Sequence, residues 1–351
     1  MKILHGITEV AGQGINSVIG LRSRNVKADM VVYRSNRSGY QKGYDLHIGK
    51  RKWLFPFDLM KMVAFFFFAI IKYDCFHFHF DRTLLPKSID LPILKCLKKK
   101  IFMEFHGTEL RGVLVEHQNE VFQAPARSEA HKKLIKKLIS YATGIILHDE
   151  ELRKYVPYNV PIYIVPLRVE IDTLRPNYSS KPENERLVVV HAPSKRNVKG
   201  TKYILEGIEQ FKEKIEFILI ENMKREEAWK IYERADIIID QLVLGIYGVL
   251  SIEAMAFGKP VIANLSDDMK VAYPEELPVV NANIHDWKEK LQELIQNDNL
   301  RHELGVKGRA YVETYHNRMK NAELLKRIYM GQQEATTATS RFSQLESILE
   351  N

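Results

Sequence analysis

Short apolar runs alternate with longer amphipathic stretches along most of the chain. The runs at 28–33, 75–80, 101–105 and 187–190 have the length and the apolar content of buried strands. The stretch 128–141 carries lysines on one helical face and aliphatic residues on the other, and 58–72 predicts an apolar helix. Strands that alternate with helices in this way predict an α/β fold.

The length of 351 residues is that of about two domains. The polar, proline-containing segment 173–186 is the best candidate linker, so we expect a first domain over 1–172 and a second over 187–314. The last residues, 332–351, form a polar tail. The basic, aromatic segment 34–53 shows no periodicity and predicts a long loop, either a surface excursion or a segment that faces an acceptor.

The stretch 245–263, GIYGVLSIEAMAFGKPVIA, predicts a glycine turn, a helix and a buried strand. Gly248 lets the backbone approach a ligand, and Gly258 with Pro260 ends the helix. The unpaired N–H groups at the start of such a helix attract phosphate. Glu253 is the one charge in a long apolar stretch. It either complements the helix dipole or accepts hydrogen bonds from sugar hydroxyls.

The segment EAMAFGKPV at 253–261 is similar to the donor-binding signature of family 4 of the retaining glycosyltransferases, which have the GT-B fold. In that family a first glutamate precedes the glycine turn, and Gly245 stands at its place here. The resemblance implies that Glu253 holds the ribose of a nucleotide, and that the change at Gly245 affects the sugar contact. It also implies two Rossmann-like domains that face a central cleft, with a helix at 315–331 that returns to the first domain.

A basic turn at the start of the second domain follows the run 187–190. Arg196 and Lys199 flank a predicted helix start, where positive side chains and exposed N–H groups suit a pyrophosphate. The alternative is a basic turn without a ligand. The resemblance supports Lys199 directly, whereas the usual spacing of the family's arginine falls on Ser194. It further implies that Glu221 lies near the nucleotide base, and that backbone groups at Tyr247, Gly248 and Val249 approach the diphosphate.

Two sites are predicted in the first domain. Gly12 and Gly14 form a glycine turn after the first strand, which is more often a tight turn than a ligand loop. The resemblance places this turn near the donor phosphates. His106 follows the strand 101–105 and matches the family's histidine that reaches the donor sugar, although a histidine that caps a turn is the alternative.

Composition excludes several classes of protein. Cys75 and Cys96 cannot form a disulfide framework, so we expect a cytoplasmic protein. His77 and His79 share a strand face without a visible third ligand, and we therefore predict structural histidines, no metal and no cofactor. The longest apolar run, 62–71, is too short to span a membrane.

The net charge of +8 favours anionic partners, and no nucleic-acid-binding signature is present. Lysines could attach the protein to the inner face of the cell membrane, or could simply be solvated. They lie at Lys95, Lys98, Lys99, Lys100, Lys132, Lys133, Lys136 and Lys137.

Together these features predict a metal-independent hexosyltransferase that uses a nucleotide-diphosphate sugar and a saccharide or lipid-linked hydroxyl acceptor. The resemblance implies retention of configuration and a role in bacterial cell-surface polysaccharide or glycolipid synthesis. Two alternatives remain. One is a sugar epimerase or phosphorylase of the same architecture, and the other is a nucleotide-binding scaffold subunit without catalysis, which the glycine at 245 favours.

Overall fold

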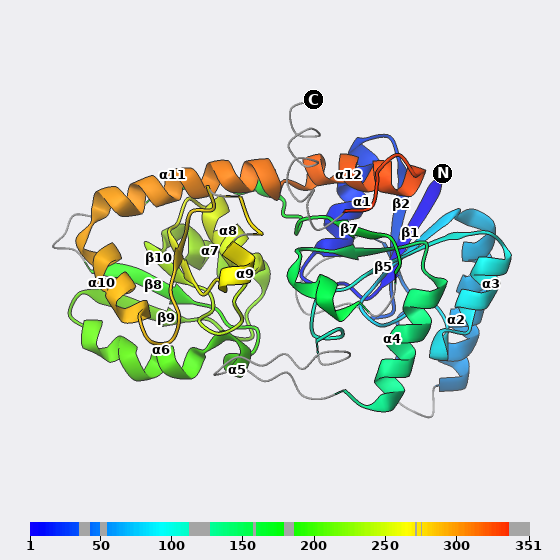
Figure 1. Ribbon diagram of the computed structural model, residues 1–351, viewed down its shortest axis with the longest axis horizontal. Helices are drawn as coiled ribbons and strands as arrows, with labels where there is room; N and C mark the ends of the chain where they lie inside the picture. Colours follow the sequence, from blue (N-terminus) through cyan, green and yellow to red (C-terminus); the bar gives the residue numbers. More distant parts are fainter. Residues whose placement is uncertain are drawn as a thin grey trace. The chain divides into compact units, whose positions relative to one another are not determined.

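The computed structural model describes residues 1–34, 43–49, 55–111, 127–156, 159–178, 186–270, 272–274 and 276–336. Parts of the predicted loop 34–53, linker 173–186 and tail 332–351 lie outside these residues. The described residues form two compact α/β units (Figure 1). The first contains the residues up to Arg168 and those from Arg318 onward, and the second extends from Val169 to Asn317.

The first unit is built on a seven-stranded parallel sheet with the order β3-β2-β1-β4-β5-β6-β7. Its strands are β1 Lys2–Ile7, β2 Lys27–Val32, β3 Tyr44–Asp45, β4 Cys75–His79, β5 Lys100–Glu104, β6 Gly144–Leu147 and β7 Ile162–Ile164. Its helices are α1 Gln13–Ser23, α2 Phe55–Lys72, α3 Asp90–Cys96, α4 Glu129–Tyr141 and α12 Arg318–Met330, with 3-10 turns at Pro86–Ser88 and Glu151–Tyr155.

Helices cover both faces of this sheet, because strands that are buried on both sides must be shielded from water on both sides. The apolar sides of α2, α3 and α4 pack on one face, and α1 with α12 packs on the other (Figure 1). Residues of α12 thus join the core of the first unit, although α12 is the last helix among the residues that the structure describes. Leu325 and Tyr329 of α12 are fully buried there.

The second unit has a five-stranded parallel sheet with the order β12-β11-β10-β8-β9. Its strands are β8 Leu187–His191, β9 Ile215–Leu219, β10 Ile237–Ile239, β11 Val261–Ala263 and β12 Val279–Asn281. Its helices are α5 Arg196–Lys199, α6 Thr201–Ile208, α7 Arg225–Arg234, α8 Val249–Ala256, α9 Asp267–Lys270, α10 Trp287–Gln296 and α11 Asp298–Tyr315, with 3-10 turns at Ile171–Thr173 and Glu209–Phe211. The predicted α/β class with two parallel sheets is confirmed.

Candidate functional site

Polar residues gather at the carboxyl ends of β8 and β10 in the second unit, which is where open parallel sheets bind ligands. Lys199, on the short helix α5, donates from its ammonium to Asp240 Oδ1 at 2.5 Å. The other oxygen of Asp240 accepts from Ser251 Oγ at 2.6 Å and from Gly248 N at 3.1 Å. One buried carboxylate therefore joins α5, β10 and the start of α8.

The charge of Asp240 is fixed by these contacts. Burial by itself would raise the pKa of this carboxyl, but the Lys199 ammonium and the hydrogen bonds from Ser251 and Gly248 hold the pKa below its usual value. Asp240 is thus an anion at neutral pH, while 12% of the Lys199 side chain is exposed. An ammonium held in this way has further donors available for an anionic ligand.

Gly248 permits the close packing of this pair. A Cβ atom at this position would lie 3.3 Å from Lys199 Nζ and 3.5 Å from Asp240 Oδ2, so a side chain would crowd the ion pair. The Gly248 N–H itself donates to Asp240, and its predicted approach to the diphosphate stays a prediction. The N–H groups of Val249, Leu250 and Ser251 follow in the first turn of α8, ahead of the Ile252 N–H, which donates to the Gly248 carbonyl at 3.2 Å.

Gly245 lies in a loop that leaves no space for a glutamate. Its φ is +78°, and an added Cβ would lie 2.9 Å from Ser266 Cβ. Gln241 holds this loop: its amide donates to the carbonyls of Ile246 and Asn264 at 2.6 Å, and its oxygen accepts from the N–H groups of two loop residues. The residue at the place of the family glutamate is therefore held in a backbone conformation that disfavours any side chain.

The side chain of Tyr247 points into the unit. Its hydroxyl lies 2.9 Å from His316 Nε2 and 3.1 Å from Tyr311 Oη, and the residue is buried. The hydroxyl is therefore engaged inside the unit, and the backbone contact with a ligand that the resemblance implied stays a prediction.

Glu253 has a partner within the second unit. Its Oε1 accepts from Arg225 Nε at 3.0 Å, and Arg225 also contacts Glu170 at 3.0 Å and lies 3.9 Å from the ring centre of Trp229. Burial raises the pKa of Glu253, and Arg225 opposes that shift. A buried carboxylate on an apolar helix requires a hydrogen-bonding or charged partner. Arg225 of α7, which the sequence pattern did not indicate, is such a partner.

Arg196 and Glu221, both predicted site residues, pair with each other. The guanidinium donates to both carboxylate oxygens at 2.8 and 2.5 Å, and 56% of the arginine side chain is exposed. Such exposed pairs are weak, so Arg196 can exchange this partner for a phosphate. Ser194, two residues before Arg196, is exposed.

In the first unit a carboxylate occupies the turn that was predicted to approach phosphate. Glu9 accepts from Gly14 N at 3.3 Å and from Ile15 N at 2.9 Å, and Gly12 precedes α1 with φ +81°. Burial raises the pKa of Glu9 to about 7, against the effect of these two hydrogen bonds. In this structure the side chain five residues upstream of Gly14 caps these N–H groups, and the approach of the turn to the donor phosphates stays a prediction.

His106 lies within a buried histidine cluster around Glu104, which contains His5, His77, His79, His106 and His148. His106 Nδ1 is 2.8 Å from His148 Nε2, and His106 Nε2 is buried 3.9 Å from Glu104 Oε1. Both ring nitrogens of His106 thus face the interior. Burial, more than neighbouring charges, lowers the pKa of His106 to about 3, so the ring is neutral.

The same cluster corrects the prediction that His77 and His79 lack a third ligand. His5 lies opposite His77 in β1, and His5 Nδ1 is 3.1 Å from His79 Nε2. Glu104 and His106 also bring ligand atoms close to His79. The guanidinium of Arg168 binds Glu104, however, and a bound arginine at the central carboxylate opposes a cation there. The cluster is better described as a neutral histidine network around one ion pair.

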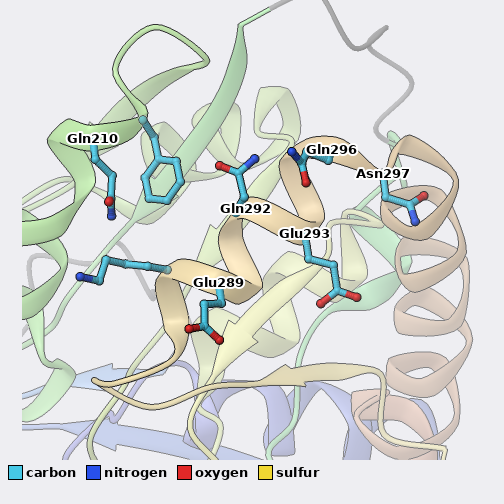
Figure 2. Close-up of a pocket in the computed structure, with 8 residues that line it drawn as sticks. Gln210, Glu289, Gln292, Glu293, Gln296 and Asn297 are labelled. Carbon is cyan, nitrogen blue, oxygen red and sulfur yellow. The ribbon is translucent and has the colours of Figure 1, made fainter.

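A pocket of about 620 Å³ opens elsewhere on the second unit (Figure 2). It is lined by Gln210, Phe211, Lys288, Glu289, Gln292, Glu293, Gln296 and Asn297, from α10 and the turn before β9. None of the predicted site residues lines it. It is therefore separate from the groups gathered around Asp240.

Known proteins resemble this chain in sequence over part of its length and in fold. Residues 182–311 match the family described as glycosyl transferases group 1. No curated protein sequence matches the chain.

Solved structures of the GT-B fold extend the similarity to both units. Sucrose-phosphate synthase from Thermosynechococcus elongatus is 17% identical with a TM-score of 0.66, over 94% of this chain and 98% of that one. HepE from Anabaena, in complex with UDP-glucose, is 11% identical with a TM-score of 0.62, over 94% and 100%. A UDP-N-acetylglucosamine 2-epimerase from Neisseria meningitidis is 13% identical with a TM-score of 0.53, over 94% and 100%. The two units therefore have the GT-B fold, and the matched family supports glycosyl transfer.

Proposed function

We propose that this protein transfers a hexosyl group from a nucleoside-diphosphate sugar to a hydroxyl acceptor, with retention of anomeric configuration. The observation that carries the proposal is the Lys199 ammonium, fixed by the buried Asp240 beside the start of α8. Charge develops on the departing diphosphate during such a transfer, and a preorganised cation beside helix N–H groups stabilises it.

Each remaining residue has a role in this proposal. Arg196 adds a second positive charge once it leaves Glu221, and Glu253, oriented by Arg225, accepts from the ribose hydroxyls. In a front-face transfer the leaving phosphate itself accepts the proton of the acceptor hydroxyl, so no protein nucleophile is needed. Lys199 and Arg196 supply the charge that a metal ion supplies in other transferases, which is why we propose a metal-independent reaction.

His106 requires a change of conformation in order to orient the donor sugar. Its buried Nε2 would have to leave the contact with Glu104, since neither ring nitrogen faces outward. The main chain at the end of β5 offers an alternative contact. The variant His106→Asn separates the two cases. If the imidazole contacts the sugar, its loss should raise the KM for the donor; if the main chain makes the contact, the KM should stay unchanged.

The donor and acceptor are proposed by chemical class. HepE was solved with UDP and with UDP-glucose, so uridine donors are the first to test. We propose a saccharide or lipid-linked acceptor, as in bacterial cell-surface polysaccharide or glycolipid synthesis, and cytoplasmic action that includes the inner membrane face. Among the described residues no helix has the length and hydropathy of a membrane span.

Release of nucleoside diphosphate from uridine, guanosine and adenosine diphosphate sugars, with and without acceptors, tests the proposal. We expect release to require an acceptor and to fall at least a hundredfold in Lys199→Met. Conversion of donor without acceptor would favour an epimerase, a reaction known for one protein of similar fold. Nucleotide binding without turnover would favour the scaffold subunit, and absence of both would contradict the proposal.

A further inference from the structure

The outer face of α2 in the first unit is apolar, although its inner face already packs in the core. Met62, Phe65, Phe66 and Ala69 are buried against the sheet. The opposite face exposes Phe57, Met60, Ala64, Phe67, Phe68 and Ile71. Of the side chains on this face, Ile71 is 85% exposed, Met60 66%, Phe57 60% and Phe67 57%. A helix that is apolar on both faces is expected only where a second apolar medium covers the outer one.

The exposed residues form one continuous stripe. Positions 57, 60, 64, 67 and 71 recur at intervals of three and four, which places them along one side of the helix. The neighbouring α3 adds Ile89, Ile93 and Leu97, which follow each other at intervals of four and are all about half exposed. Both helices cover the same sheet face (Figure 1). We call these residues of α2 and α3 the apolar stripe.

Positive charge surrounds the apolar stripe, because exposed lysines outnumber the exposed acidic residues beside it, among which are Asp74 and Glu129. Lys61, Lys95, Lys98, Lys133 and Lys136 are exposed on α2, α3 and α4 or directly after α3. Each of these helices contains one acidic residue: Asp58 and Asp90 are buried, and Glu129 pairs with Lys132 at 2.9 Å. The helices therefore present apolar and cationic side chains to their surroundings.

We propose that the apolar stripe inserts into the interfacial region of an anionic lipid bilayer, with the surrounding lysines on the lipid headgroups. Aromatic and aliphatic side chains on one face and lysines at its edges are the composition of interfacial helices. The buried inner face of α2 keeps this helix on the surface of the bilayer. Lysine attachment alone was predicted from the sequence; the apolar insertion by α2 is the new element, and it does not depend on glycosyl transfer.

A second copy of the chain is the weaker candidate for covering the apolar stripe. Self-association through this face would bring the same lysines of both copies together, and the three helices offer one exposed acidic residue, Glu129, which already pairs with Lys132. Anionic headgroups, in contrast, complement these lysines, and hydrocarbon accepts the phenylalanines. Charge complementarity thus selects the bilayer.

Co-sedimentation of the full chain with vesicles of phosphatidylcholine, with or without phosphatidylglycerol, tests the proposal. We expect strong binding to the anionic vesicles at low salt and a residual part at high salt, because salt screens the lysines but not the apolar contact. The variant Phe57→Ser/Met60→Ser/Phe67→Ser/Ile71→Ser should bind at least tenfold more weakly. The matched control Leu205→Ser/Val306→Ser, which changes exposed apolar residues of the second unit, should bind as the unchanged protein does.

A charge variant separates the two contributions. Lys133→Glu/Lys136→Glu should lose binding several-fold on anionic vesicles only, whereas Lys202→Glu/Lys288→Glu should have no effect. All the substituted side chains are exposed or nearly so, and unchanged melting temperatures would show that the variants fold. Ile71→Trp should give a blue-shifted emission with vesicles, and Leu205→Trp should not.

Three results would overturn the proposal. The first is absence of binding to every vesicle, and the second is equal binding by the four-residue serine variant. The third is a protein that does not bind vesicles but forms a concentration-dependent dimer, which the four-residue serine variant abolishes. A second copy would then cover the apolar stripe.

Discussion

Exchange of Asp240 for asparagine tests how Lys199 is held. The substitution keeps the shape of the Asp240 side chain and removes its charge. Lys199, whose side chain is 12% exposed, then has lost the counter-ion of its ammonium. Two unit charges at the observed 2.5 Å attract by about 7 kcal/mol at an effective dielectric constant of 20. Desolvation cancels part of this energy, and the loss of one partner of a buried pair costs about 3–5 kcal/mol. Since Lys199 can turn toward water, we expect about 3 kcal/mol for Asp240→Asn.

A double-mutant cycle with Lys199→Met isolates the pair. Each single variant leaves one charge uncompensated, whereas the double variant leaves none, so we expect a coupling energy of about 2–3 kcal/mol. Urea unfolding followed by tryptophan fluorescence suits the measurement, because Trp229 and Trp287 both belong to the second unit. The melting temperature of each single variant should fall by about 6–12 °C.

The cycle has a clear contrary outcome. If the two substitutions were additive within about 0.5 kcal/mol, Asp240 would not hold Lys199, and the basis for a preorganised cation would be lost. A control cycle with Lys202 and Glu206, an exposed pair 3.8 Å apart on α6, should give a coupling below about 0.5 kcal/mol.

Three further predictions concern stability. Gly245→Ala should destabilise the protein by about 1–3 kcal/mol in urea unfolding, because φ is +78° and Ser266 leaves no space; equal stability would mean that this loop has another shape. Gln241→Leu should cost about 3 kcal/mol and speed hydrogen exchange at the N–H groups of Val243 and Leu244, since four hydrogen bonds are lost; unchanged exchange would contradict this. Stability should fall as the pH drops below about 6.5, because burial lowers the pKa of the cluster histidines below their unfolded value, so only the unfolded chain takes up their protons. Glu9 and Glu109, whose pKa burial raises to about 7, act in the opposite sense and are fully stabilising only below their unfolded pKa. Urea midpoints measured by circular dichroism at several pH values test the balance, and midpoints that rise toward pH 5 would refute it.

Local patterns allowed much of the fold to be predicted. The amphipathic stretch 128–141 became α4 at Glu129–Tyr141, with Ser128 as its N-cap, and the glycine–helix–proline pattern became α8 at Val249–Ala256. The short elements α3 and β12 were missed, because a helix of seven residues and a strand of three carry too few positions to show a period.

The partners of the site residues were beyond sequence reasoning. Lys199 and Asp240 are 41 positions apart, and Arg225 and Glu253 are 28 apart, so only the folded sheet brings each pair together. Glu9 lies five positions from Gly14, yet an acidic residue near a glycine turn does not by itself indicate a cap. Polar residues directly after a buried strand, such as Asp240, were the signal that was available.

Calorimetric titration with uridine diphosphate measures whether Lys199 binds the diphosphate of a nucleotide. We expect binding to the unchanged protein, at least tenfold weaker binding to Lys199→Met, and unchanged binding to Lys202→Met. Uridine diphosphate is the first ligand to titrate because HepE was solved in complex with it, and guanosine and adenosine diphosphates should be titrated for comparison. Equal affinity of a nucleotide for Lys199→Met and the unchanged protein would contradict the account.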